Sequence, residues 1–142
     1  MKDKIKIAVI GSRAGYPKDP AEMIEELLKV ENLNKNEIII VSGGARGVDS
    51  IAESWARSNN VETLIFPADW KNLGKGAGYI RNVQIIDSAD IVLAIWDGQS
   101  RGTRHSLYLS RKSGKKVYLV NPEFHLANQE ELPKSLNYKT NE

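Results

Sequence analysis

Short apolar runs alternate with longer segments of helical period along the chain. The strand candidates are Lys4–Ile10, Glu37–Val41, Val61–Phe66, Asp90–Trp96 and Lys115–Val120. β-branched residues dominate these runs with little polar alternation, which is typical of strands buried on both faces of a parallel sheet. The helix candidates lie near Pro20–Val30, Val48–Asn59, Ala77–Ser88 and Thr103–Ser113. The pattern predicts an α/β fold in which helices flank a doubly wound, mainly parallel five-stranded sheet.

The domain boundary is expected just after the fifth strand. Residues 1–121 form the predicted domain, and a length of 142 residues suits one domain rather than two. Residues 122–142 form a polar C-terminal tail with weak periodicity. Such a segment either wraps loosely over the domain or is disordered.

Three loops of similar chemistry are expected at one edge of this sheet. In an open parallel sheet, ligands bind beyond the carboxyl ends of the strands, where the strand order reverses. The order 3-2-1-4-5 brings together the loops "GSRAGYPKD", "SGGARGVD" and "WDGQSRGT", which carry Arg13, Arg46 and Arg101. Glycines let backbone N–H groups approach an anion, and helix N-termini add partial positive charge. The sequence therefore predicts a site for a polyanion or a sugar phosphate.

Composition excludes several other kinds of site. Twenty basic and eighteen acidic side chains give a net charge of +2, too small to indicate nucleic-acid binding by bulk charge. The chain has no cysteine and two histidines, so we expect no metal site and no cofactor. The amino terminus resembles neither a signal peptide nor a membrane span. We expect a cytoplasmic protein of a bacterium or phage, without a membrane partner.

Two common nucleotide motifs are missing from the loops. "SGGARGVD" lacks the G-K-[ST] of a Walker A loop, and "GSRAGY" does not supply G-x-G-x-x-G. Ser42 also stands where a dinucleotide-binding strand carries its ribose-binding acid. Any nucleotide is therefore bound in another way.

The motifs "GSR", "SGGARGVD", "FPADW", "GKGAGYIRN" and "IWDGQSRGT", in this order and spacing, resemble the SLOG superfamily. The resemblance covers about Ile5 to Val120 and is strongest to its YspA and YpsA-related group. This superfamily of Rossmann-like domains includes the Lonely Guy phosphoribohydrolases and DNA-processing protein A. It implies a pocket for a nucleoside phosphate or an ADP-ribose-like signal, which the protein would sense or sequester.

The candidate ligand-binding residues are Gly11, Ser12, Arg13, Gly43, Gly44, Ala45, Arg46, Gly47, Asp49, Asp69, Trp70, Arg81, Asn82, Asp97, Gly98, Ser100, Gly102 and Thr103. Some of them have structural alternatives. Asp49 is a possible cap of the second helix, and Arg81 a possible ion-pair partner of an acid on a neighbouring loop. Trp96 is not among these candidates, and it either stacks on a base or packs in the core.

The resemblance leaves the activity open. Lonely Guy enzymes cleave N-glycosidic bonds with a P-G-G-x-G-T-x-x-E motif. Here "DGQSRGTRHS" places Ser106 at the glutamate position, while Gly102 and Thr103 are retained. We expect binding without efficient hydrolysis, with Asp97 as the best catalytic candidate and Asp49 and Asp69 as substitutes. The alternative is a phosphoribohydrolase acting on nucleoside monophosphates.

Two other partners remain open. Single-stranded DNA would use stacking rings, with Tyr16, Trp70 and Tyr79 as candidates, although no long basic stripe favours it. A homodimer would use the second and fourth predicted helices. Trp55 is expected in the core, and His105 and His125 on the surface.

Overall fold

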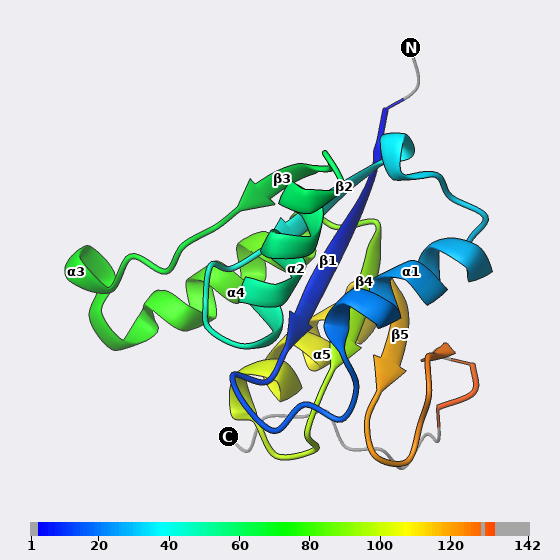
Figure 1. Ribbon diagram of the computed structural model, residues 1–142. Helices are drawn as coiled ribbons and strands as arrows, with labels where there is room; N and C mark the ends of the chain where they lie inside the picture. The colour runs from blue at the N-terminus through cyan, green and yellow to red at the C-terminus, as the bar shows by residue number, and fades with distance from the viewer. Residues whose placement is uncertain (1–2, 129, 133–142) are drawn as a thin grey trace.

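A computed structural model describes residues 3–128 and 130–132, and one six-stranded sheet forms its centre (Figure 1). The strands are β1 (Ile5–Gly11), β2 (Ile38–Ser42), β3 (Glu62–Ile65), β4 (Ile91–Ile95), β5 (Lys116–Val120) and β6 (Ala127–Asn128). They lie in the order β3-β2-β1-β4-β5-β6, and all pairs are parallel except β5 with β6. The expected order 3-2-1-4-5 is confirmed. It brings the loops after β1, β2 and β4 to one edge of the sheet.

The helices follow the predicted segments closely. They are α1 (Pro20–Val30), α2 (Val48–Ser58), α3 (Trp70–Leu73), α4 (Ala77–Ser88) and α5 (Arg101–Lys112), with 3-10 turns η1 (Lys35–Glu37) and η2 (Gly74–Gly76). Helix α1 begins where the sequence indicates, because Asp19 accepts a hydrogen bond from the Ala21 N–H at 3.1 Å and Pro20 occupies the first turn. Helix α5 begins two residues earlier than expected, so that Arg101 and Gly102 belong to its first turn.

Strand side chains alternate between two core layers. In β1, Ile7 and Val9 pack in the layer of α1 and α2, whereas Ala8 and Ile10 pack in the layer of α4 and α5. The central strands are therefore apolar on both faces, as the sequence predicts. Each buried Val, Leu or Ile contributes about 1.5–3 kcal/mol to folding. The strand ends that carry the three loops are consequently held in fixed positions.

Two short elements were not predicted from the sequence pattern. Helix α3 has four residues and begins where Asp69 accepts a hydrogen bond from the Asn72 N–H at 3.3 Å. Strand β6 has two residues, lies in the predicted tail and makes the sheet six-stranded rather than five-stranded. Elements of this length are too short to show a period of 3.6 or 2. Residues 129 and 133–142 of the tail lie outside the described part of the chain.

No helix among the described residues has the length and apolar character needed to cross a membrane.

Candidate functional site

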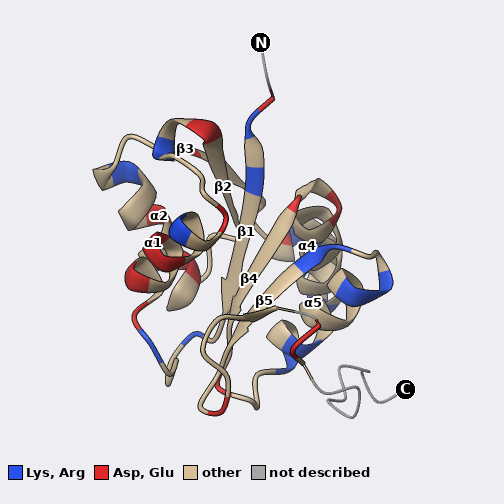
Figure 2. Cartoon of the chain, turned by 90° about the vertical axis from the view of Figure 1, so that its right-hand side faces the viewer, with Lys and Arg blue, Asp and Glu red and all other residues tan. Residues whose placement is uncertain are grey.

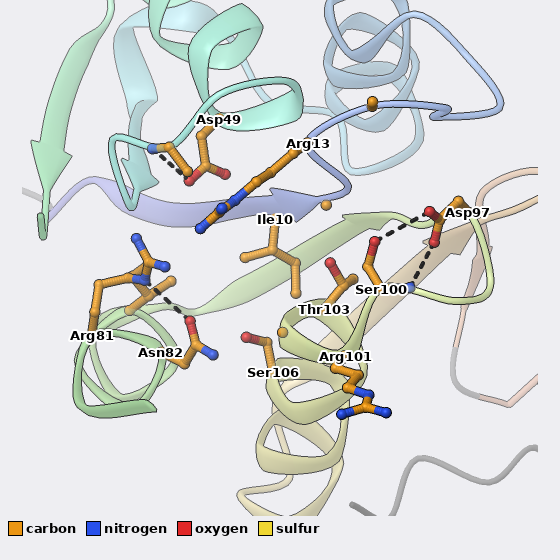
Figure 3. A pocket seen from close by; sticks show the side chains of 15 residues that line it. Ile10, Arg13, Asp49, Arg81, Asn82, Asp97, Ser100, Arg101, Thr103 and Ser106 are labelled. Atoms are coloured by element: carbon orange, nitrogen blue, oxygen red, sulfur yellow. Dashed lines mark hydrogen bonds between the residues drawn. The ribbon is translucent and has the colours of Figure 1, made fainter. Parts of the chain in front are cut away.

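The carboxyl edge of the sheet contains a cavity of about 450 Å³, which we call the main cavity (Figure 3). The loops after β1, β2 and β4 form its walls together with α4 and the first turns of α5. Its lining residues are Ile10, Gly11, Arg13, Ala14, Ala45, Asp49, Arg81, Asn82, Ile85, Asp97, Ser100, Arg101, Gly102, Thr103 and Ser106. The three loops therefore converge as the sequence predicts.

Gly47 lets the start of α2 approach the loop after β1. The Val48 N–H donates to the Ser12 carbonyl oxygen at 3.1 Å. Gly47 has a φ of +76°, and a Cβ built on it would lie 2.4 Å from the Arg13 carbonyl oxygen. A side chain at this position would therefore separate the two loops. Gly47 shapes the site without lining it.

Ser12 joins the loop after β1 to the loop after β4. Its N–H donates to the Ile95 carbonyl oxygen at 3.2 Å, and its Oγ accepts from the Asp97 N–H at 3.0 Å. The Ser100 Oγ also lies 3.2 Å from the Ser12 Oγ. Ser12 is buried and does not line the main cavity, so its polar atoms fix the loops to one another.

Asp97 organises the turn that leads into α5. Its Oδ1 accepts from the N–H groups of Gln99 and Ser100, both at 2.8 Å, and its Oδ2 accepts from the Ser100 hydroxyl at 3.2 Å (Figure 3). Partial burial raises the pKa of Asp97, but the hydrogen bonds from Ser100, Gln99 and Ser12 outweigh it and leave the pKa below its usual value. At neutral pH this carboxylate is ionised and acts as an acceptor.

Asp49 faces the main cavity from the opposite side (Figure 3). It is 8% exposed, and its Oδ2 accepts from the Ala45 N–H at 3.2 Å. Burial raises its pKa to about 6, although the Ala45 N–H and the cation of Arg81 act in the opposite direction. The N-cap of α2 is Gly47, so the interpretation of Asp49 as the helix cap is wrong.

A hydrogen-bond chain positions Arg81. Its Nη1 donates to the Gly43 carbonyl oxygen at 2.9 Å, and its Nε donates to the Asn82 Oδ1 at 3.2 Å. The Asn82 Nδ2 lies 3.3 Å from the His105 Nδ1, and the His105 ring meets the Tyr79 ring edge to face at 4.6 Å between centroids. Burial lowers the pKa of His105, so a neutral ring whose Nδ1 accepts fits this chain. In the described part of the chain, Arg81 forms no ion pair with an acid on a neighbouring loop.

Positive charge and backbone N–H groups gather around the main cavity. The exposed side chain of Arg13 extends across its mouth toward Arg81 (Figure 3). Gly102 and Thr103 bring the N-terminus of α5 to the opposite wall, and the first turn of α5 has no acidic residue. Unpaired N–H groups and the helix dipole attract anions at such a position.

A second cavity of about 390 Å³ adjoins the main cavity. It is lined by Arg13, Gly43, Gly44, Ala45, Arg46, Pro67, Ala68, Trp70 and Arg81. Arg13, Ala45 and Arg81 line both cavities and therefore form the wall that they share.

The structure separates the predicted site residues into three groups. Ten of them line the main cavity: Gly11, Arg13, Ala45, Asp49, Arg81, Asn82, Asp97, Ser100, Gly102 and Thr103. Four others line the second cavity: Gly43, Gly44, Arg46 and Trp70. Ser12, Gly47, Asp69 and Gly98 line neither of them. The cavities are also lined by residues outside the predicted ligand-binding set, namely Ile10, Ala14, Ile85, Arg101, Ser106, Pro67 and Ala68. Arg101 and Ser106 could have been predicted from the sequence, because both lie in the segment after β4 that also contains the candidates Gly102 and Thr103.

The remaining predictions concern tryptophan and histidine side chains, and one of them is wrong. Trp55 is buried in the layer of α1 and α2, as predicted. Trp96 is 4% exposed and its Nε1 donates to the Ser100 carbonyl oxygen at 3.1 Å, which favours the packing alternative. His125 is exposed as expected, and its Nε2 lies 3.1 Å from the Glu26 Oε1. His105 is half-buried rather than on the surface, because Tyr79 packs against it. The described residues contain no cluster of metal-ligating side chains.

The fold is Rossmann-like, with a polar cavity at the carboxyl edge of a mainly parallel sheet. The model of the YspA, cpYpsA-related SLOG family matches residues 5–73. The chain is also 35% identical over 118 residues to the gene 61 protein of Mycobacterium phage D29, covering 79% of this chain and 93% of the phage protein. The chain belongs to the YspA, cpYpsA-related SLOG family.

Solved structures support the same fold. DNA processing protein A from Streptococcus pneumoniae has a TM-score of 0.62 and 25% identity, covering 82% of this chain and 50% of that protein. DNA processing protein A from Helicobacter pylori, whose structure describes its single-stranded DNA binding mode, has a TM-score of 0.59 and 27% identity. The match covers 82% of this chain and 65% of that protein. The chain thus spans between half and two thirds of these two proteins. A molybdenum cofactor binding protein from Rippkaea orientalis shares the fold at a TM-score of 0.61 and 23% identity, covering 85% of this chain and 78% of that protein.

Proposed function

We propose that the protein binds a nucleotide or a nucleotide-derived ligand in the main cavity and acts as a sensor or sequestering protein. The observation that carries the proposal is the convergence of arginines and the α5 N-terminus on one polar cavity at the sheet edge. A phosphate group suits this position, because charge-assisted hydrogen bonds from arginine and backbone N–H groups are stronger than neutral ones. Membership of the SLOG family supports the same class of ligand.

The proposed pose follows from the two sides of the main cavity. The phosphate lies near Gly102, Thr103 and Arg13, where the positive groups gather. The sugar hydroxyls point toward Asp49 and Asn82, because carboxylate and amide oxygens accept hydrogen bonds from hydroxyl groups. Arg81 is held in place by the Gly43 carbonyl, so it offers an already oriented cation.

Binding without turnover is the activity that we propose. Ser106 lines the main cavity at the position where phosphoribohydrolases of the superfamily carry a glutamate. A serine hydroxyl cannot serve as a general acid or base at neutral pH without an activating partner. Asp97 is engaged by two backbone N–H groups, and its pKa is lowered, so proton donation from it is unfavourable.

Titration calorimetry with Arg13→Ala tests the proposal. The ligands are nucleoside monophosphates and nucleoside diphosphate sugars, chosen after mass spectrometry of the small molecules released by denaturing the purified protein. We expect Arg13→Ala to weaken binding at least tenfold, because a hydrogen bond to a charged group contributes about 1.5–3 kcal/mol. Arg57→Ala is the matched control, since Arg57 is an exposed arginine in the last turn of α2. Absence of binding, or equal binding by Arg13→Ala, contradicts the proposal.

Single-stranded DNA is the second candidate ligand, and two exposed rings favour it. Trp70 is 54% and Tyr79 is 57% exposed, and the Helicobacter pylori neighbour binds single-stranded DNA. Stacking on such rings contributes about 1–3 kcal/mol per base. Tyr16, the third ring expected from the sequence, is half-buried and packs against the core. Fluorescence anisotropy with labelled oligothymidylate tests this function, which requires binding that weakens in both Trp70→Ala and Tyr79→Ala.

A further inference from the structure

The two cavities at the sheet edge differ in chemistry. Asp49, Asn82 and Thr103 give the main cavity polar walls that suit a sugar. The second cavity contains an indole ring, a proline ring and a stretch of glycine backbone, supplied by Trp70, Pro67 and the Gly43–Gly44 pair, and it also contains the cation of Arg46. Acidic residues are absent from the described lining of the second cavity. One cavity therefore suits a hydroxylated group and the other a planar group.

The ring edge of Trp70 lies against α4, although the side chain is exposed to solvent. A Cβ built on Gly78 of α4 would lie 3.3 Å from the Trp70 Cη2 atom, which is tighter than most real Cβ contacts. The ring edge therefore packs against the bare backbone of α4. Its 54% exposure leaves much of the side chain uncovered beside the second cavity. An uncovered indole ring beside a cavity is a stacking platform for a heterocyclic base.

The wall shared by the cavities carries two cations. Arg13 and Arg81 line both cavities, and Figure 3 shows the Arg13 side chain directed toward Arg81. Arg81 is fixed by the Gly43 carbonyl and by Asn82. Two neighbouring guanidinium groups repel each other unless an anion lies between them. A diphosphate supplies negative charge on two neighbouring phosphate groups, and arginine pairs well with phosphate.

We propose that the two cavities form one bipartite site for a nucleoside diphosphate joined to a sugar. The base stacks on Trp70 in the second cavity, and the sugar enters the main cavity. The diphosphate lies against Arg13 and Arg81 rather than at the α5 N-terminus, where we place the phosphate of a smaller ligand such as ribose 5-phosphate. This inference rests on the proposed function and specifies its ligand class. It assigns a base-binding role to Trp70 and to the second cavity.

Intrinsic fluorescence offers a direct test, because Trp55 and Trp96 are buried and Trp70 is exposed. ADP-ribose, GDP-mannose and UDP-glucose serve as two-part probes with different bases, and ribose 5-phosphate serves as the half probe. We expect at least one two-part probe to protect the emission from acrylamide quenching, whereas ribose 5-phosphate binds without protecting it. Calorimetry should show that this two-part probe binds at least tenfold more tightly than ribose 5-phosphate.

Substitution of Trp70 separates this inference from the proposed function. Trp70→Ala should reduce the affinity for the two-part probe about tenfold and leave the affinity for ribose 5-phosphate unchanged, while Trp70→Phe retains most of the affinity. Leu73→Ala is the matched control, because Leu73 is an exposed apolar residue of α3 outside both cavities. Equal affinities of Trp70→Ala and the parent for the two-part probe overturn the bipartite site only. If neither kind of probe binds to the parent, the proposed function fails as well.

Discussion

Asp49 and Asp97 border the same cavity, but their pKa values move in opposite directions. Asp49 is buried in the first turn of α2, where the N–H groups of Ala45 and Gly43 offset only part of its desolvation. Asp97 receives two backbone hydrogen bonds and one from a hydroxyl group, so its ionised form is favoured. Desolvation therefore decides the state of Asp49 and hydrogen bonding that of Asp97. Sequence alone does not distinguish them, because each aspartate follows a strand by a few residues.

The raised pKa of Asp49 predicts a pH-dependent effect of Asp49→Asn on stability. Between the usual value of 3.8 and about 6 the folded state binds more protons than the unfolded state, so this group's contribution falls as pH rises. We expect Asn, which is never charged, to stabilise the protein at pH 7.5 by up to about 3 kcal/mol. The gain should be mostly lost at pH 4, which is close to the usual pKa of 3.8, and should disappear below it. Urea unfolding of parent and variant across this range measures it.

The parent protein is the reference at each pH, so the contributions of other carboxylates cancel from the difference. Ser50→Ala is the control, because Ser50 is the exposed neighbour of Asp49 in α2. A stability difference that does not change with pH contradicts the burial of a titrating Asp49.

At the scale of elements, the glycines of the three loops have different purposes. Gly47 permits the contact between the start of α2 and the loop after β1, whereas a Cβ built on Gly102 meets nothing within 4 Å. Both glycines stand in motifs that resemble phosphate-binding loops. The structure assigns a packing role to Gly47 and an open position on the cavity wall to Gly102.

Alanine substitutions should separate these two roles. Gly47→Ala combines a positive φ with a contact of 2.4 Å, so we expect it to destabilise the fold by more than about 2 kcal/mol. Gly102→Ala lies in the first turn of α5 and should raise stability by about 0.5–1 kcal/mol. Its added methyl group should nevertheless weaken phosphate binding. Thermal unfolding followed by circular dichroism tests both, and equal stability of the two variants would contradict this assignment.

The sequence predicted the long elements well and the short ones poorly. Five strands and four helices have distinct patterns, because apolar residues recur in them with the required period. Helix α3 and strand β6 depend on Asp69 capping and on pairing with β5, which are tertiary or very local features. The main cavity was predictable for a similar reason: the strand order places its loops together. The division between two cavities was not, because it depends on the side-chain directions of Arg13 and Arg81.

At the scale of the whole molecule, charged and apolar groups are unevenly distributed. Figure 2 shows acidic residues on α1 and basic residues on α5, without a continuous basic stripe on the face in view. The large exposed apolar side chains of the described residues are Val30, Ile65, Trp70, Leu73, Tyr79, Ile80 and Val83. Most of them lie on β3, α3 and α4 rather than on α2 and α5, the helices expected to form a homodimer. The homodimer through α2 and α5 remains a prediction, and the exposed apolar side chains do not support those two helices as its surface.

The carboxylates of the main cavity define what hydrolysis would require. Cleavage of an N-glycosidic bond needs a group that favours the transition state over the bound ligand, through proton transfer or through a carboxylate near the developing cation. Asp97 is ionised and engaged by the α5 turn. Asp49, with a pKa of about 6, has the value closer to that of a proton donor. The two aspartates would therefore contribute to hydrolysis in different ways, and substitution of each one can tell them apart.

Chromatography of free base tests whether the protein turns its ligand over. Incubation with nucleoside monophosphates that calorimetry shows to bind should release no base above the uncatalysed rate, because arginines and backbone N–H groups hold ground state and transition state alike. Rapid release that is lost in Asp97→Asn with affinity retained would contradict the binding-only proposal and make Asp97 catalytic. The same loss in Asp49→Asn, with a rate that falls as pH rises through about 6, would instead identify Asp49 as a general acid.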